Sequence, residues 1–431
     1  MKRKTLAISI LAVILCFGFT FAALAAAASP KGLVLTAIDN MNFEHNQKFY
    51  NQSSGTMTFT VDKFGGNSLK EVKIPVGTSL DCDIKLDVPG KKSVFDLNLK
   101  YNNKTYQGQA YLAGDKLIFT KSFITALQEL APQSNLDIPD QLPEYLYLSD
   151  SMLEQPLFTQ IWTSMLNYPN DKITEESKAL LKFFVEAIPE EYFSTSGGTV
   201  TLELDQDGFI ATINAVMQKV KDEKERFAEI IVTLTTASDT TGVMGSPEQM
   251  KAEIIKGIDD AVKNGAWPTE DQVKMVGMFI QVNQLKYQTA IIPGGKSNFN
   301  ASIALKPETG FTGQIDINSE SAGKTDNLTS AYTFELKFTG PDGLSFNGTF
   351  EGDMTVKDEE MTQNMAFSAT AQKAGAMEFD VAISSQSTQQ VEDGINISVP
   401  VLTDSNSLNI EKFIETGKNA TVKVPEGESN I

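Results

Sequence analysis

The sequence predicts an α+β fold, in which helices cover the concave face of a curved antiparallel meander of β-strands. Three observations support this prediction. Residues 57–119 and 278–399 alternate apolar and polar side chains with the period of two that a half-buried strand requires. Residues 122–275 carry one-sided apolar stripes at helical spacing. Short turns join successive strands, which makes neighbouring strands antiparallel.

The first 28 residues are predicted to be a signal peptide. Three basic residues at positions 2–4 precede an apolar run over residues 6–28, and Ala26–Ala28 provide the small side chains that a signal peptidase requires. The same run is long enough to remain as an uncleaved anchor across roughly 30 Å of hydrocarbon. We expect cleavage, no stable membrane span afterwards, and a secreted or cell-envelope protein.

The mature chain is strongly acidic. Without the first 28 residues it holds 33 Lys and Arg against 55 Asp and Glu, a formal net charge of −22. Such a surface repels phosphate backbones, so we expect no nucleic-acid partner. Cys82 is the only cysteine of the mature chain, so no internal disulfide is possible and stability must come from a buried core.

Residues 29–193 are predicted to hold an N-terminal helix, the first meander and further helices. Ser29 and Pro30 have the composition of a first helical turn. In the meander, a strand over residues 95–101 turns at Asn102 and Asn103, and the next strand turns again at residues 113–116.

Residues 194–277 are predicted to be a mainly helical insertion. Ser246 and Thr269 each precede a glutamine by three residues, which is a capping-box pattern, and Gly265 follows the first of these two helices. Each helix has a single apolar stripe, so we expect the helices to lie against another layer.

Residues 278–431 are predicted to form a second antiparallel meander with a short terminal helix. Its strands number at least six, with residues 299–305 pairing with residues 311–317. The strands are apolar on one face only, and that face needs a cover.

Three glycines interrupt the apolar face of this second meander, namely Gly313, Gly348 and Gly352. The stretch LSFNGTFEGDMTV, residues 344–356, places Gly348 and Gly352 on the apolar side of a strand, where glycine indicates a bend, a bulge or the close approach of another group. Two interpretations stay open. Aromatic neighbours fill the spaces and leave a solid core, or the missing side chains let the sheet curl into a trough that the helices only partly fill.

The second interpretation predicts a non-enzymatic protein that binds a lipid or another amphiphile, because phenylalanine and adaptable methionine are prominent on this face. The predicted ligand-binding residues are Phe334, Phe338, Phe346, Gly348, Phe350, Gly352, Met354, Met365, Phe367 and Phe379. The alternative is an extracellular or envelope protein with a solid core and no ligand, which has an interaction or structural role.

This arrangement of an exported chain, an N-terminal helix, an antiparallel meander and closing helices resembles the LolA and LppX type of lipoprotein carrier, whose half-barrel holds lipid. The similarity covers residues 30–190 and again 278–400, and it assigns no binding residue to this sequence. It implies lipid carriage. The chain departs from that pattern in being much longer than a single such domain and in its helical middle section.

The sequence predicts no cofactor, no metal site and no catalytic centre. His45 is the only histidine, which excludes multi-histidine metal sites and leaves a histidine-based hydrolase without a signalled partner. Cys82 alternates with aspartates and shares a face with Ile84, so it is predicted to be a small core residue.

Two weaker patterns are given structural interpretations. Ser321 and Lys324 have the S-x-x-K spacing of some serine hydrolases but lack the companion motifs, and the segment is predicted to be a polar turn. Asp205 lies in a stretch that resembles a calcium loop, yet Asn214 occupies the position of the bidentate glutamate. We therefore expect Asp205 to cap a helix.

Overall fold

The structure is a computed structural model of the chain. It describes residues 29–39, 49, 51–70, 74–130, 142–153, 156–166, 171–238, 246–291, 295–305, 310–324 and 326–410. The predicted signal peptide, His45 and the predicted short terminal helix lie outside the described residues.

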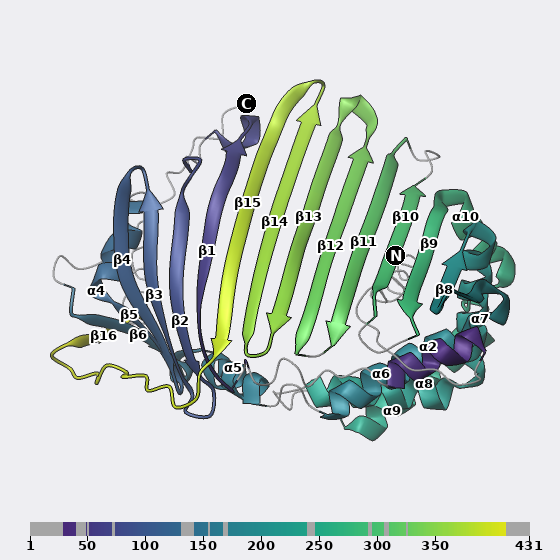
Figure 1. The fold of residues 1–431 in the computed structure, drawn as a ribbon, viewed down its shortest axis with the longest axis horizontal. Coiled ribbons are helices and arrows are strands. Elements are labelled where there is room, and N and C mark those ends of the chain that lie inside the picture. Colours follow the sequence, from purple (N-terminus) through teal and green to yellow (C-terminus); the bar gives the residue numbers. More distant parts are fainter. Residues whose placement is uncertain are drawn as a thin grey trace, which may run out of the picture. The chain divides into compact units, whose positions relative to one another are not determined.

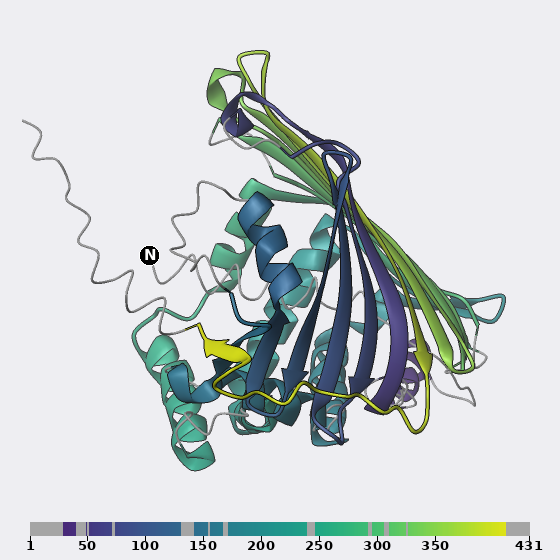
Figure 2. The same ribbon diagram turned by 90° about the vertical axis from the view of Figure 1, so that its left-hand side faces the viewer.

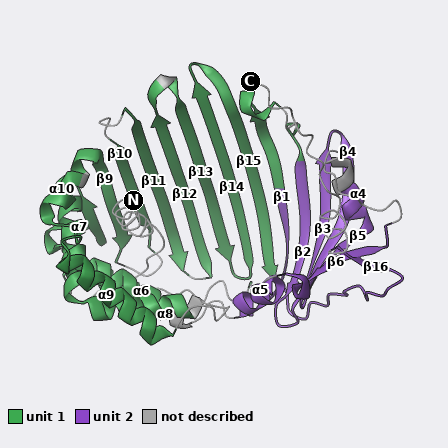
Figure 3. Cartoon of the chain, turned by 180° about the vertical axis from the view of Figure 1, so that it is seen from behind, with its two compact units in different colours: residues 1–49, 59–78, 167–390 green, residues 50–58, 79–166, 391–431 purple. Residues whose placement is uncertain are grey.

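The chain divides into two compact units that interleave along the sequence (Figure 3). Unit 1 comprises residues 1–49, 59–78 and 167–390, and unit 2 comprises residues 50–58, 79–166 and 391–431. The sequence prediction instead placed its boundaries at residues 194 and 278. Strand β1 (Gln52–Gly65) contributes residues to both units.

The strands of unit 1 form an antiparallel meander in which each strand is hydrogen-bonded to the next along the chain, and Figure 1 shows β9 to β15 side by side. The pairing of Ile303 with Ile315 confirms the predicted register of the second meander. The strands are β7 (Phe193–Ser196), β8 (Thr199–Leu204), β9 (Ile280–Ala290), β10 (Ser297–Leu305), β11 (Thr312–Lys324), β12 (Asn327–Thr339), β13 (Ser345–Lys357), β14 (Glu360–Lys373) and β15 (Ala376–Val391).

The helices of unit 1 gather at the β7 to β9 end of this meander (Figure 1). They are α2 (Pro30–Asp39), α6 (Asp171–Ala187), α7 (Gln206–Asp222), α8 (Lys224–Ser238), α9 (Pro247–Lys263) and α10 (Glu270–Phe279). Helices α2, α7 and α10 contact β7, β8 or β9, while α6, α8 and α9 pack around Phe183, Ile230 and Ile258. The one-sided stripes thus bury against both the sheet and one another, as their periodicity predicts.

The predicted helix starts are confirmed. Asp205 Oδ1 accepts a hydrogen bond from the backbone N–H three residues later at 2.8 Å, and Ser246 Oγ does the same at 3.2 Å. Thr269 and Gln272 exchange reciprocal side-chain to backbone bonds of 3.3 and 3.0 Å. These bonds satisfy N–H groups that the first helical turn leaves unpaired.

Unit 2 holds the first predicted meander. Its strands are β2 (Ser79–Asp87), β3 (Lys92–Tyr101), β4 (Lys104–Ala113), β5 (Lys116–Thr120), β6 (Tyr145–Ser149) and β16 (Ser407–Asn409). The predicted turn between β3 and β4 is confirmed, with Asn102 and Asn103 at φ of 50° and 60°. Strand β16 pairs in parallel with β6, so a late segment lies beside early ones, as the yellow arrow among the blue strands of Figure 2 shows.

Helices α4 (Lys121–Leu130) and α5 (Leu157–Leu166) pack on the strands of unit 2. Trp162 and Phe158 of α5 form a buried cluster with Val88 and Leu112. A Cβ at Gly108 would lie 2.6 Å from the Cα of Phe123 in α4. This strand glycine therefore permits the close approach of a helix backbone.

Candidate ligand-binding face

One face of β11 to β15 is apolar, and we call it the open face. The strand register places on it the odd-numbered residues 313–323 of β11, the even-numbered residues 328–338 of β12 and 346–356 of β13, and the odd-numbered residues 361–371 of β14 and 379–389 of β15. Directly paired residues on antiparallel strands share a face, so their side chains form rows across the sheet.

The central row of the open face is aromatic. Phe334, Phe350, Phe367 and Ile383 lie directly opposite one another on four adjacent strands. They are 36, 38, 43 and 39% exposed, respectively. Since strands are spaced about 4.8 Å apart, this aromatic row presents partly exposed apolar groups over about 14 Å.

The same row continues into the helix-covered part of the sheet. Phe334 pairs with Ile317, Ile317 with Ala301, and Ala301 with Leu285. Ala301 and Leu285 are only 3 and 6% exposed and belong to the core cluster that includes residues of α2 and α7. The predicted helix cover therefore holds for β7 to β10, whereas the aromatic row on β12 to β15 stays partly exposed.

Neighbouring aromatic rings occupy the space that a side chain would fill at Gly348 and Gly352 of β13. A Cβ at Gly352 would lie 2.6 Å from Tyr332 Oη, and one at Gly348 would lie 3.1 Å from the ring of Phe346. Tyr332 is the direct cross-strand partner of Gly352. Aromatic neighbours thus fill the spaces over these glycines, as in the first of the two interpretations.

All ten predicted ligand-binding residues lie on the open face, and several of them touch. The rings of Phe346 and Phe379 are 6.2 Å apart, and those of Tyr332 and Phe350 are 5.4 Å apart. The prediction missed Ile383, which completes the aromatic row. The signal for it was its pairing with Phe367, which requires the register of β14 and β15 rather than the alternation of either strand alone.

A separate cavity of about 60 Å³ lies in the helix-covered part of unit 1. Its lining includes Val34, Phe209, Leu285 and Phe299, and none of the ten predicted residues. The hydroxyl of Thr212 also lines it and has no hydrogen-bond partner among the described residues. This volume would admit a few water molecules, but the almost wholly apolar lining disfavours them.

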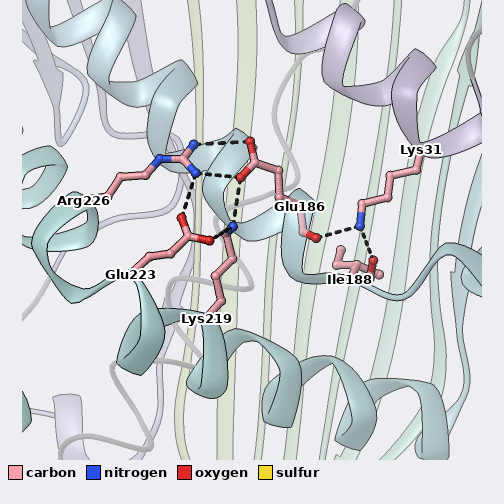
Figure 4. A network of polar contacts seen from close by, with 6 residues as sticks. All are labelled: Lys31, Glu186, Ile188, Lys219, Glu223 and Arg226. Atoms are coloured by element: carbon pink, nitrogen blue, oxygen red, sulfur yellow. Dashed lines mark hydrogen bonds and ion pairs between the residues drawn. The ribbon is translucent and has the colours of Figure 1, made fainter.

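A polar cluster of Lys31, Glu186, Lys219, Glu223 and Arg226 ties helices of unit 1 together rather than forming a reactive site (Figure 4). Glu186 Oε2 accepts from Arg226 Nη1 at 2.8 Å and lies 3.0 Å from Lys219 Nζ, and Glu223 binds the same two cations. Lys31 Nζ donates to the backbone oxygen of Glu186 at 2.6 Å at the end of α6. Burial raises the pKa of Glu186, but hydrogen bonds and charges from Arg226 and Lys219 outweigh it and lower this pKa overall.

The remaining sequence candidates have structural roles. Cys82 is buried, which raises the pKa of its thiol to about 11 and confirms its place in the core. The predicted polar turn begins later than Ser321, because Ser321 and Lys324 both lie within β11 and the chain turns back between Lys324 and Asn327. Three residues apart on a strand, their side chains point to opposite faces and cannot form a catalytic pair.

The described part of the chain contains no group of three or more His, Cys, Asp or Glu residues arranged to hold a metal ion. Among its helices, none is both long and apolar enough to cross a membrane.

In comparisons with known proteins, no family model and no curated protein matches this chain. Among solved structures, it is similar to a loop-deletion mutant of OmpT, an outer membrane protein of Vibrio cholerae, with 7% identity over 79% of this chain and 96% of that one and a TM-score of 0.18. The Pseudomonas aeruginosa proteins OccK5 and OccK3 match with 6 and 8% identity over 79% of this chain, and over 98 and 95% of theirs. Both have a TM-score of 0.13, and similarities at this level support no conclusion about fold or function.

Proposed function

We propose that this chain is an exported, non-enzymatic protein that binds a lipid or another amphiphile on the open face. The observation that supports this proposal is the partly exposed aromatic row on β12 to β15, whose cross-strand register continues to buried aliphatic side chains on β9 and β10. Apolar side chains therefore continue along this row from β9 to β15. Contiguous exposed apolar surface of this kind is typical of binding sites.

The similarity to LolA and LppX type carriers belongs to the same proposal. Such carriers hold lipid against the apolar side of a meander, and here that side carries all ten predicted residues. The ligand would lie on the face of the sheet between rings, because the glycines are filled and the interior cavity is small.

The test compares two sets of variants in a binding assay. We would purify the full chain, identify co-purifying lipids by mass spectrometry, and titrate an uncharged environment-sensitive fluorophore. Phe350→Ser combined with Phe367→Ser should weaken fluorophore binding about tenfold or more, equivalent to about 1.4 kcal/mol. Phe279→Ser is the matched control, because Phe279 is 46% exposed but lies on α10.

A second function is favoured by the filled glycines, which leave the open face without a deep groove. The chain would then be an envelope interaction protein whose face contacts another protein. Protein that is repeatedly recovered without lipid and shows no change in fluorophore binding in the double variant would favour this alternative.

A further inference from the structure

The open face carries no charged side chain. At each position that defines the open face, the residue is apolar, glycine, serine, tyrosine or glutamine. The next position in the alternation of β14 is Lys373, the last residue of that strand. Charged residues lie on the opposite face of the same strands, among them Asp316, Glu320, Glu335, Lys337, Glu351, Asp353 and Asp380. In a chain with 36 basic and 55 acidic residues, this separation sets the chemistry of any bound ligand.

The open face also changes character along the strands. On one side of the aromatic row the next rows are apolar, for example Leu336 and Val381. On the other side the next two rows mix hydroxyl and amide groups with Gly352, Met354 and Met365, and we call the polar residues of these rows the hydroxyl strip. They are Ser319, Ser321, Ser330, Tyr332, Gln363, Ser385 and Ser387. Residues two apart on a strand are separated by about 7 Å, so the hydroxyl strip begins about 7 Å from the aromatic row.

The polar groups of the hydroxyl strip are accessible for hydrogen bonding. All seven residues are half-buried, and their side chains form no hydrogen bond with another described residue. In the helix-covered part of the sheet the same row contains Thr289 and Ser297, whose hydroxyls are buried and lie 2.9 Å apart. Hydroxyls there satisfy each other, whereas on β11 to β15 no described residue is their partner and solvent or a ligand can take that place.

We propose that the ligand of the open face is an uncharged amphiphile whose chain crosses the aromatic row and whose hydroxyl-bearing head lies on the hydroxyl strip. This inference rests on the proposed amphiphile binding. A charged head on this face would lose hydration without gaining an ion-pair partner. An uncharged polyol head both donates and accepts hydrogen bonds, as the serine, tyrosine and glutamine side chains do.

The first experiment compares amphiphiles that share one alkyl chain and differ only in the head. An alkyl glucoside, an alkyl sulfate and an alkyl trimethylammonium would compete with the uncharged fluorophore below their micellar concentrations. We expect the glucoside to bind about tenfold more tightly than either ion, with little dependence on salt. Equal or tighter binding of a charged amphiphile overturns the inference while leaving amphiphile binding intact.

The second experiment adds a charge to the hydroxyl strip. Gln363→Glu places a carboxylate on the open face, and we expect it to weaken glucoside binding about threefold or more and to favour the trimethylammonium amphiphile. Gln386→Glu is the matched control, because Gln386 is exposed on the opposite face of the neighbouring strand. If both variants show the same head preference as the unmodified protein, the head does not lie on the strip. Failure of every amphiphile to bind overturns the proposed function as well.

Discussion

Replacing Phe350 with alanine tests whether the open face is exposed in solution. Phe350 lies at the centre of the aromatic row between Phe334 and Phe367, and its ring contacts Tyr332. Phe299 is the matched reference, because it lies on the same side of the sheet in β10 but is only 4% exposed and belongs to the main core cluster of unit 1.

The two substitutions should differ in cost for a stated reason. Complete burial of a phenylalanine side chain contributes about 1.5–3 kcal/mol. Phe350 is 38% exposed, so its burial accounts for about 1–2 kcal/mol, and solvent can enter the space that the substitution creates. Phe299→Ala leaves an enclosed space and should cost about 3–5 kcal/mol.

The measurement is the free energy of unfolding from urea titrations of both variants and the unmodified chain at one protein concentration. We expect Phe350→Ala to cost less than half as much as Phe299→Ala. Equal losses of 3 kcal/mol or more would show that the aromatic row is fully covered in solution, and the open face would then no longer be a free binding surface.

Three further predictions concern separate features. Gly352→Ala places a Cβ 2.6 Å from Tyr332 Oη and 2.8 Å from the carbonyl oxygen of Asn364, so it should lower the free energy of unfolding by about 1–3 kcal/mol. Gly257→Ala is the control, because its Cβ would meet no atom within 4 Å, and it should raise the free energy of unfolding by up to about 1 kcal/mol. The lowered pKa of Glu186 means that its ion pairs stabilise the fold above the ordinary pKa of 4.5 and lose this effect as pH falls. The urea midpoint should therefore decline less steeply between pH 6 and 3 for Glu186→Gln than for the unmodified chain, and an equally steep decline would contradict this. Burial raises the pKa of the Cys82 thiol to about 11. In a chain carrying Cys16→Ser, this thiol should therefore react with a thiol reagent at pH 8 about a hundredfold more slowly in the folded protein than in urea. Equal rates would place the thiol outside the core.

Local patterns in the sequence predicted the strands, the helix caps and the membership of the open face. The alternation around Phe334 and Phe350 identifies the apolar side of each strand, because side-chain direction depends only on the local period of two. Ser246 and Asp205 were identified as caps for the same reason, since the required groups lie within three residues. Strands and helix caps can therefore be predicted from the sequence before any tertiary contact is known.

The extent of the helix cover was not predictable in this way. The stripes of α7 and α10 show that these helices are buried on one side but contain no information about which strands they meet. The role of Gly352 was equally open, because whether Tyr332 sits over it depends on the register of β12 against β13. The completion of the aromatic row by Ile383 has the same origin.

On β11 to β15 the charged side chains lie mainly on the face opposite the aromatic row. Charges on the opposite face, such as Glu335 and Glu351, keep that face hydrated and contribute to the net negative charge that makes molecules repel one another. A charge on the open face would achieve the same locally but would also remove the apolar surface. The absence of charge from the positions that define the open face, with side chains such as Phe367 left partly exposed, is what the proposed uncharged amphiphile requires.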